Sequence, residues 1–449
     1  MTNRSPAAPL ARALIRSLTR GTAIPQGVRY IHVGHDEWLG AQDELLTEIA
    51  EDGHSETKFV RGAYGAGKSH FLSVVQDRAR QQGWMTSHIE CKVDKVQIDR
   101  FETLYPRITA KLLSTDILEE IGAASDQAAV DPMRSLLERW TKLQLRAAGI
   151  REGTITRPFD IDDRLYRQLQ RGLLQTNLPP DFTRVLAAYA RASVADDFET
   201  VNGMVAWLRG TNERLSLPAA YLRRPSPSST RDDSRVEVRP IGKGTVHEVM
   251  RGLLWLIRAS GYAGLVLCID EVEELAKLGS RKRQDQALQA LREYVDHAGG
   301  EGGYYNLCMY LAATPDMFEG EQYFPHYEAL ATRIQPVGDQ LSWRSPVIDL
   351  DRTPLGKKQM REVAQRIAAI HHAAYGERGA VHVTPEEIDE LVTALFQSKI
   401  RIAKPRLLAR VLVDALDRAR QGNNIPKLLA HPSAAIAKAA SDIEKEAAE

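Results

Sequence analysis

The segment FVRGAYGAGKSHFL, residues 59–72, constrains the fold of this chain more than any other stretch. It has the GxxxxGK[ST] spacing of a P-loop, directly after a short apolar run and directly before residues with helical periodicity. Glycines let a backbone wrap a phosphate with several N–H groups, and the following helix adds the positive end of its dipole. The order of strand, glycine loop and helix therefore predicts a nucleotide-binding α/β domain. A structural turn before a helix is the alternative.

Each polar residue of the predicted P-loop has an expected role toward ATP. Lys68 would bridge the β- and γ-phosphates, and the Ser69 hydroxyl would ligate Mg²⁺. The nucleotide-binding residues predicted in this segment are Gly62, Ala63, Tyr64, Gly65, Ala66, Gly67, Lys68, Ser69 and His70.

A second signal is LVLCIDEVEE, residues 265–274, an apolar run that ends in acidic residues. Hydrolytic P-loop proteins need a carboxylate at such a strand tip. Asp270 would hold Mg²⁺ through water, and Glu271 would polarise the attacking water as general base. An acidic pair that caps a helix N-terminus is the alternative, because carboxylates favour the positive end of the dipole.

Three further residues are candidates for sensing the γ-phosphate. Thr314, in LAATPD, would orient the attacking water, or would only cap the next turn. Arg333, in YEALATRI, would serve as an arginine finger toward a neighbouring subunit, and Arg406 would close over the nucleotide within its own chain. Arginines at solvated helix ends are the alternative for both.

Strand and helix patterns alternate in the first part of the chain, then become helical in every segment of residues 125–222. The proline- and serine-rich residues 223–235 are expected to form a mobile loop. The expected helices are 8–18, 37–51, 69–82, 99–114, 245–260, 355–373, 384–397, 404–420 and 432–447, and the expected strands are 58–61, 86–91, 265–269, 307–313 and 346–350.

These patterns divide the chain into four expected parts. Residues 1–120 form a lead-in and the first half of the ATPase domain, and residues 121–240 a helical insertion with the mobile loop. Residues 241–354 form the second half of the ATPase domain, and residues 355–449 a C-terminal helical lid.

The charge balance and the apolar content limit which binding partners and which cellular location we expect. Lysine plus arginine number 59, as do aspartate plus glutamate, so no bulk field draws the chain to nucleic acid or to an acidic membrane. Only local basic stretches, 401–410 and 281–283, would contact DNA phosphates, and both read equally as solvated helix faces. No apolar run approaches the ~18 residues of a membrane span, which leads us to expect a cytoplasmic protein.

The cysteines and histidines give no sign of a metal site. Cys91, Cys268 and Cys308 each lie in an apolar run without a CxxC partner, so we expect reduced core residues. The histidines, including His371 and His372, lack the spacing of zinc ligands.

With these motifs in view, the chain resembles an AAA+ ATPase of the branch near origin-recognition and transposition ATPases. More closely, GVRYIHVGHDE, KFVRGAYGAGKSHFL and GYAGLVLCIDEVEEL are similar to the ATP-binding protein family of BREX phage-defence loci, BrxD. The chain departs from the AAA+ pattern at Thr314, where asparagine is usual, and at the start of the lid helix, where lysine stands in place of glycine.

The resemblance implies a fold, a function and further site residues. The implied fold is an AAA+ type P-loop NTPase with a five-stranded parallel sheet, a helical insertion and a C-terminal helical lid. The implied function is Mg²⁺-dependent ATP hydrolysis in antiphage defence, with other defence proteins as partners, a helicase-like one among them. It also implies that Val33 and Gly34 lie near the adenine.

Three functions stay open at this point. The chain would act as an ATP-driven switch or motor, as a nucleotide-gated DNA-binding scaffold like replication initiators, or as a signalling NTPase whose helical insertion binds proteins. If Arg333 acts on a neighbour, the active form is a homo-oligomer that depends on nucleotide.

Overall fold

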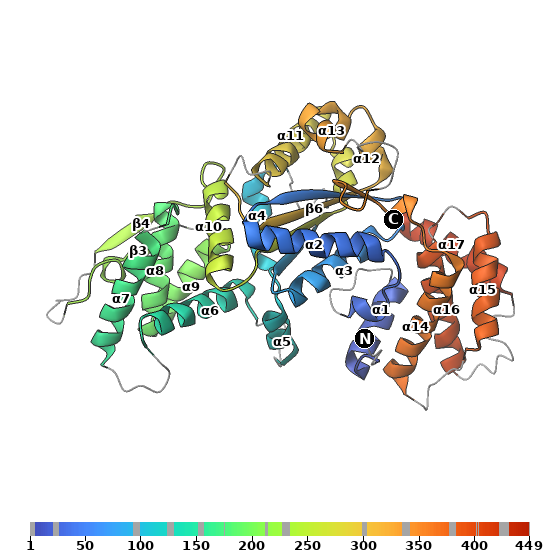
Figure 1. Ribbon diagram of the computed structural model, residues 1–449, viewed down its shortest axis with the longest axis horizontal. Coiled ribbons are helices and arrows are strands. Elements are labelled where there is room, and N and C mark those ends of the chain that lie inside the picture. Colours follow the sequence, from blue (N-terminus) through green and yellow to red (C-terminus); the bar gives the residue numbers. More distant parts are fainter. Residues whose placement is uncertain are drawn as a thin grey trace. The chain divides into compact units, whose positions relative to one another are not determined.

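The structure is a computed structural model of the chain (Figure 1). It describes residues 5–20, 27–92, 99–123, 130–150, 157–174, 176–211, 214–226, 234–298, 303–334, 342–376, 383–400, 402, 404–421 and 431–448. In this described part, no helix is both long enough and apolar enough to cross a membrane.

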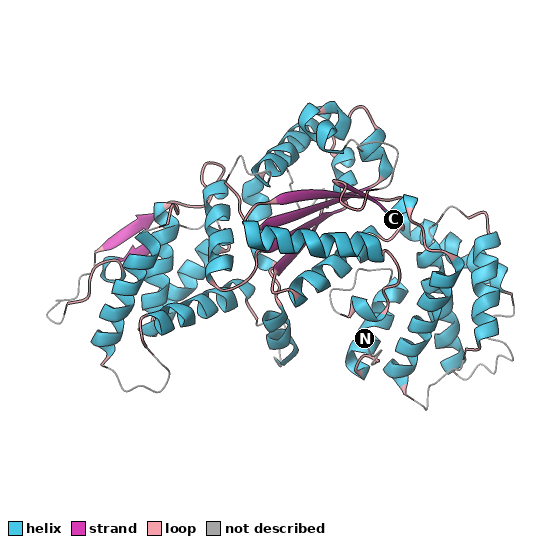
Figure 2. Ribbon diagram, viewed as in Figure 1, coloured by secondary structure: helices cyan, strands magenta, loops and turns pink. Residues whose placement is uncertain are grey.

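Helices make up most of the described residues (Figure 2). The α-helices are α1 (Ala8–Arg20), α2 (Asp36–Asp52), α3 (Lys68–Gln81), α4 (Phe101–Ala110), α5 (Thr115–Ala123), α6 (Pro132–Ala147), α7 (Pro158–Leu174), α8 (Pro180–Val194), α9 (Phe198–Leu208), α10 (Val246–Ala259), α11 (Arg281–Ala298), α12 (Pro315–Glu319), α13 (Glu328–Ile334), α14 (Lys357–Tyr375), α15 (Pro385–Gln397), α16 (Lys404–Arg420) and α17 (Pro432–Ala448). The strands are β1 (Glu56–Arg61), β2 (Met85–Glu90), β3 (Leu215–Pro218), β4 (Arg235–Val238), β5 (Leu265–Asp270), β6 (Leu307–Ala313) and β7 (Val347–Asp349).

The central element is a five-stranded parallel sheet with the order β2-β5-β6-β1-β7. Every residue of β5 and β6 is buried. Strands covered on both faces carry continuous apolar runs instead of alternating ones, which is why the sequence patterns LVLCI and LCMYLAA predict them. The expected parallel α/β fold with five strands is therefore confirmed.

The chain separates into two compact units, and strands β1 and β6 each contribute residues to both. The first unit comprises Met1–Glu44, Lys58–Arg78 and Leu311–Glu449. The second comprises Leu45–Thr57 and Ala79–Tyr310.

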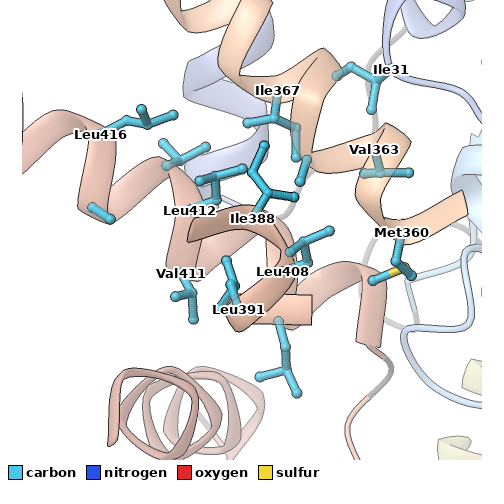
Figure 3. Packing of buried hydrophobic residues seen from close by; sticks show 14 of the residues in the cluster. Ile31, Met360, Val363, Ile367, Ile388, Leu391, Leu408, Val411, Leu412 and Leu416 are labelled. Carbon is cyan, nitrogen blue, oxygen red and sulfur yellow. The ribbon is translucent and has the colours of Figure 1, made fainter. Parts of the chain in front are cut away.

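The C-terminal helices of the first unit form a bundle around one apolar core, which we call the lid core (Figure 3). In Figure 3, Leu408 and Leu412 of α16 lie beside Ile388 and Leu391 of α15. The periodicity of the sequence predicts these helices to within a few residues, because each has one apolar stripe and a charged outer face.

Helix α1 belongs to the same lid core, a packing that the sequence does not predict. Its buried residues Ala11, Leu14 and Ile15 are members of the core, and α1 packs against α14 and α16 (Figure 1). Arg410 of α16 donates to the carbonyl oxygen of Thr19 in the last turn of α1. The described beginning and end of the chain thus share one apolar core.

One expectation for the second unit, that of helix throughout residues 125–222, is wrong. Residues 215–218, expected as helix, form strand β3, which pairs antiparallel with β4. Its four residues alternate between buried and half-buried, a signal too short to outweigh the helical segments around it. Strand β4 begins at Arg235, the end of the expected mobile loop, whereas residues 227–233 of that loop lie outside the described part of the chain.

The expected helix 99–114 is also too long. Helix α4 ends at Ala110, and Leu113 instead forms an isolated antiparallel bridge with Thr86 of β2. The Thr86 N–H donates to the Leu113 carbonyl at 2.8 Å, and the Leu113 N–H donates to the Thr86 carbonyl at 2.8 Å. Strand β2 lies at the edge of the sheet, where its outer backbone groups have no neighbouring strand to bond to. Leu113 bonds to these groups, and the helix therefore ends before it.

Gly264, directly before β5, is a position where we expect a large loss of stability on substitution. Its φ is +152°, and an added Cβ would lie 2.3 Å from the Asn306 carbonyl oxygen and 2.4 Å from Trp84 Cζ3. Gly264→Ala should therefore lower the melting temperature by at least about 5 °C, since overpacking against backbone typically costs ~1–3 kcal/mol and strain adds to it. Thermal unfolding followed by circular dichroism measures this shift.

The matched control for Gly264 is Gly279→Ala. An added Cβ at Gly279 has no heavy atom within 4 Å in the described structure, so its melting temperature should stay close to that of the unaltered chain. Equal melting temperatures for the two variants would contradict the close approach at Gly264.

Candidate functional site

The glycine loop connects β1 to α3, in the strand, loop and helix order that the sequence predicts. Gly65 and Gly67 have φ values of 80° and 102°, in the left-handed region that favours glycine. At Gly62 an added Cβ would lie 3.1 Å from Ala66 Cβ and 3.3 Å from Lys68 Cγ. The left-handed backbone favours glycine at Gly65 and Gly67, and close side-chain packing favours it at Gly62.

Lys68 is the first residue of α3 and is only 7% exposed. Its Nζ donates to the carbonyl oxygens of Gly62 at 2.9 Å and Ala63 at 3.5 Å, so the ammonium group lies against the loop. The following residue, Ser69, is half-buried, and its carbonyl accepts from Ser73 Oγ at 2.8 Å. A fixed cation and a hydroxyl next to left-handed glycines suit a phosphate group with its metal ion.

Two residues far along the chain hold the start of the loop. The Ala63 N–H donates to Asp351 Oδ2 at 2.9 Å, and the Gly62 N–H donates to the Ala313 carbonyl at 3.4 Å. Asp351 follows β7, and β7 lies next to β1 in the sheet. Sequence reasoning missed Asp351, because no local pattern links the residues after β7 to the loop after β1.

Thr314 directly follows Ala313, so it lies where β6 meets the loop. It occupies the N-cap position of α12, yet its side chain makes no capping hydrogen bond. The capping alternative is therefore not supported. The Thr314 backbone directly follows the carbonyl that accepts from Gly62, and the role of Thr314 as a sensor of the γ-phosphate stays a prediction.

Asp270 is the last residue of β5, in the second unit, and Glu271 directly follows it. Asp270 is 1% exposed, and its Oδ1 accepts from the Glu271 N–H at 2.9 Å. Its Oδ2 lies 3.7 Å from His88 Nε2 on the adjacent strand β2. The Glu271 backbone N–H thereby fixes one oxygen of this buried carboxylate.

Glu271 has a strained backbone, with φ 56° and ψ 39°, which is uncommon outside glycine, asparagine and aspartate. It precedes a 3₁₀ helix, Val272–Lys277, but its side chain does not cap that helix. Burial, followed by the charge of Asp270, raises the pKa of the Glu271 carboxyl group. A carboxylate with a raised pKa accepts a proton more readily, as a general base must.

The predicted adenine residues Val33 and Gly34 lie in the segment before α2, against residues at the start of α14. Val33 is 8% exposed and belongs to the lid core. Gly34 has φ +82°, and an added Cβ would lie 2.7 Å from Leu355 Cδ2. The tight approach at Gly34 explains a glycine there without any ligand, so a contact with adenine stays a prediction.

His70, predicted to bind nucleotide, packs on the lead-in segment, and a contact with nucleotide stays a prediction. Its Nε2 lies 3.2 Å from His32 Nδ1, and the two rings stack with centroids 5.4 Å apart. Burial lowers the pKa of His70 to about 3 and that of His32 to about 4, so both rings are neutral near pH 7. The pair joins the helix after the loop to the segment that contains Val33.

The two candidate arginines lie on the helices predicted for them. Arg406, in the first turn of α16, has its Cζ 5.3 Å from the ring centroid of Tyr64 in the glycine loop. Arg333 is half-buried in α13, after β6. A role for Arg333 toward a neighbouring subunit involves a second copy of the chain and stays a prediction.

The candidate residues divide between the two units. The glycine loop, Thr314 and Arg406 lie in the first unit, together with Val33 and Gly34. Asp270 and Glu271 lie in the second. In the order of the sheet, β6 separates β1 from β5.

Comparison with known proteins identifies the family. The model of the family described as BREX system ATP-binding protein BrxC/D matches residues 8–429. This range contains the glycine loop, the acidic end of β5 and three of the four C-terminal helices. None of the curated proteins matches the chain. The chain belongs to the BrxC/D family of BREX system ATP-binding proteins.

Proposed function

We propose that this chain hydrolyses ATP with Mg²⁺ and so works as a switch or motor within BREX antiphage defence. The observation that carries the proposal is the glycine loop, in which left-handed Gly65 and Gly67 lead directly into Lys68 at the start of α3. A loop of this path with a cation at the helix N-terminus suits a nucleotide phosphate.

The residues of the loop fit ATP and its metal ion. The loop backbone would cradle the phosphates, and the Lys68 ammonium would offset the charge of their oxygens. Ser69, and Asp270 through water, would hold Mg²⁺, which neutralises phosphate charge when bound.

Glu271 would supply the proton acceptor for hydrolysis. In the proposed step, the oxygen of a water molecule attacks the γ-phosphorus, one water proton moves to a Glu271 carboxylate oxygen, and the bond to ADP breaks. The Thr314 hydroxyl would orient that water, and Arg406 would contact the γ-phosphate within its own chain. The raised pKa of Glu271 and the uncapped Thr314 hydroxyl support these roles.

A direct test is equilibrium binding of fluorescent ATP, together with phosphate release, in Mg²⁺ and in excess EDTA. We expect tight binding and slow turnover in Mg²⁺, and no turnover in EDTA. A purified, folded chain that binds no ATP in Mg²⁺ would refute the proposal.

Assembly forms part of the proposal, through Arg333. If its guanidinium acts on a neighbour's γ-phosphate, Arg333→Ala should retain ATP binding and reduce turnover by about 10³-fold. Turnover and sizing with ATP on a Glu271→Gln background measure both consequences. Arg292→Ala, an exposed arginine further along α11, is the matched control. Normal turnover in Arg333→Ala, or a monomer with bound ATP, would contradict the trans role.

Nucleotide-gated DNA binding is a second candidate function, favoured by one local surface. Arg281, Lys282 and Arg283 are all exposed at the start of α11. In the other basic stretch, Lys404 lies over the Phe396 ring and Arg410 holds the end of α1, whereas Arg401 falls outside the described residues. A mobility shift on duplex DNA should weaken with salt and on replacing residues 281–283 with alanine.

The proposed partners are other BREX proteins, a helicase-like one included, and the proposed location is the cytoplasm. In support of a reducing compartment, Cys91, Cys268 and Cys308 are buried and unbridged, as the sequence predicts. Burial raises the pKa of the Cys91 and Cys268 thiols well above the usual range, so both stay protonated.

A further inference from the structure

Tyr64 is a large aromatic residue in a loop that otherwise consists of glycine and alanine before Lys68. Its side chain is 55% exposed, one of four large apolar or aromatic side chains exposed in the described part of the chain. The backbone path of the loop depends on its glycines and gives no reason for a ring at this position.

The Tyr64 ring contacts the lid through Arg406. The guanidinium Cζ lies 5.3 Å from the ring centroid, within the ~6 Å range of a cation–π interaction. The next two residues of α16, Leu407 and Leu408, are fully buried in the lid core, so the backbone of Arg406 is fixed relative to that core. The Tyr64 ring therefore links the glycine loop to Arg406, whose backbone is held by the lid core.

The character of this contact matters for what Arg406 can do. A ring face attracts the guanidinium through its quadrupole and occupies none of the five N–H donors. Among the described residues, no hydrogen bond or ion pair involves the Arg406 side chain. Its donors are thus available to phosphate oxygens while the ring holds the group beside the loop.

We propose that Tyr64 is a positioning residue that holds the Arg406 guanidinium over the glycine loop, ready for the γ-phosphate of ATP. This inference rests on the proposed function and deepens it. Because ADP lacks the γ-phosphate, Tyr64 would contribute to the preference of the site for ATP over ADP. It would act through Arg406 and not by touching the reacting atoms.

The test compares the dissociation constants of ATP and ADP in Mg²⁺ for the full chain and for variants at Tyr64. Tyr64→Leu removes the ring face and should reduce the ATP-over-ADP preference by about 3- to 10-fold, the range expected for a cation–π contact. Tyr64→Phe keeps the ring face and should retain most of the preference. Tyr305→Leu replaces another exposed tyrosine, outside the loop, and is the matched control.

A double-variant cycle assigns the effect to Arg406. Arg406→Gln should itself lower the ATP preference, and adding Tyr64→Leu to it should cause no further loss. Equal losses in Tyr64→Phe and Tyr64→Leu, or additive losses with Arg406→Gln, would overturn the inference. So would a parallel fall in ATP and ADP affinity, which indicates a ring that contacts the base or the loop alone.

The same measurements separate this inference from the proposed function. ATP binding that depends on Lys68 but not on the Tyr64 ring would reject the inference and leave the proposed function standing. If the unaltered chain binds no ATP, or if Lys68→Ala does not weaken its ATP binding, both are rejected.

Discussion

Lys68→Ala is expected to weaken ATP binding by about 10- to 100-fold and to reduce turnover below detection. The estimate of binding follows from the loss of charge-assisted hydrogen bonds worth ~1.5–3 kcal/mol. The ammonium group lies against the Gly62 and Ala63 carbonyls at the start of α3, so the loop itself fixes this cation at the helix N-terminus. Titration with fluorescent ATP and a phosphate-release assay measure the two effects.

Lys68→Met separates the charge of Lys68 from its packing. Methionine keeps an apolar stem of similar length, which matters because Lys68 is almost fully buried. Both variants should lose ATP binding, and Lys68→Met should melt close to the unaltered chain. Turnover at the unaltered rate in either variant would remove the glycine loop from the proposed site.

Glu271→Gln should have the opposite pattern, with ATP binding retained and turnover reduced by about 10²- to 10⁴-fold, the usual contribution of a general base. Glutamine keeps the size of the side chain and cannot accept the proton from water. The left-handed backbone at Glu271 does not depend on the carboxylate, because that side chain makes no capping hydrogen bond. The binding and phosphate-release assays used for Lys68 separate the two properties.

Glu274→Gln is the matched control, since Glu274 lies three residues further on and pairs with Lys277 on the 3₁₀ helix. Its turnover should equal that of the unaltered chain. The pH profile adds a second readout: because the Glu271 pKa is raised above its usual 4.5, turnover should rise with pH through a value above 4.5. Turnover of Glu271→Gln equal to that of Glu274→Gln would assign the base elsewhere.

The sequence predicted the parts of the fold that depend on local patterns. The glycine loop, the buried strands β5 and β6, and the lid helices each carry their signal within a few consecutive residues. The same holds for Asp270 and Glu271, because a strand tip is recognised from its own apolar run.

What the sequence could not predict depends on contacts between distant residues. Asp351 and Ala63 are 288 positions apart, and nothing near Asp351 marks it as a partner of the loop. The ring of Tyr64 under Arg406 and the bridge of Leu113 to Thr86 are of the same kind. The hairpin of β3 and β4 was missed for a different reason, since four residues are too few for an alternating pattern to be distinguished from a helix.

The place of α1 among the lid helices has a consequence for synthesis. Helix α1 is translated more than three hundred residues before α14 and α16. At ~5–20 residues per second, its apolar stripe therefore has no packing partner for roughly 20 to 70 s. During that interval Leu14 and Ile15 are open to chaperones or to other nascent chains. The ribosome thus synthesises residues 21–356 before this bundle can close.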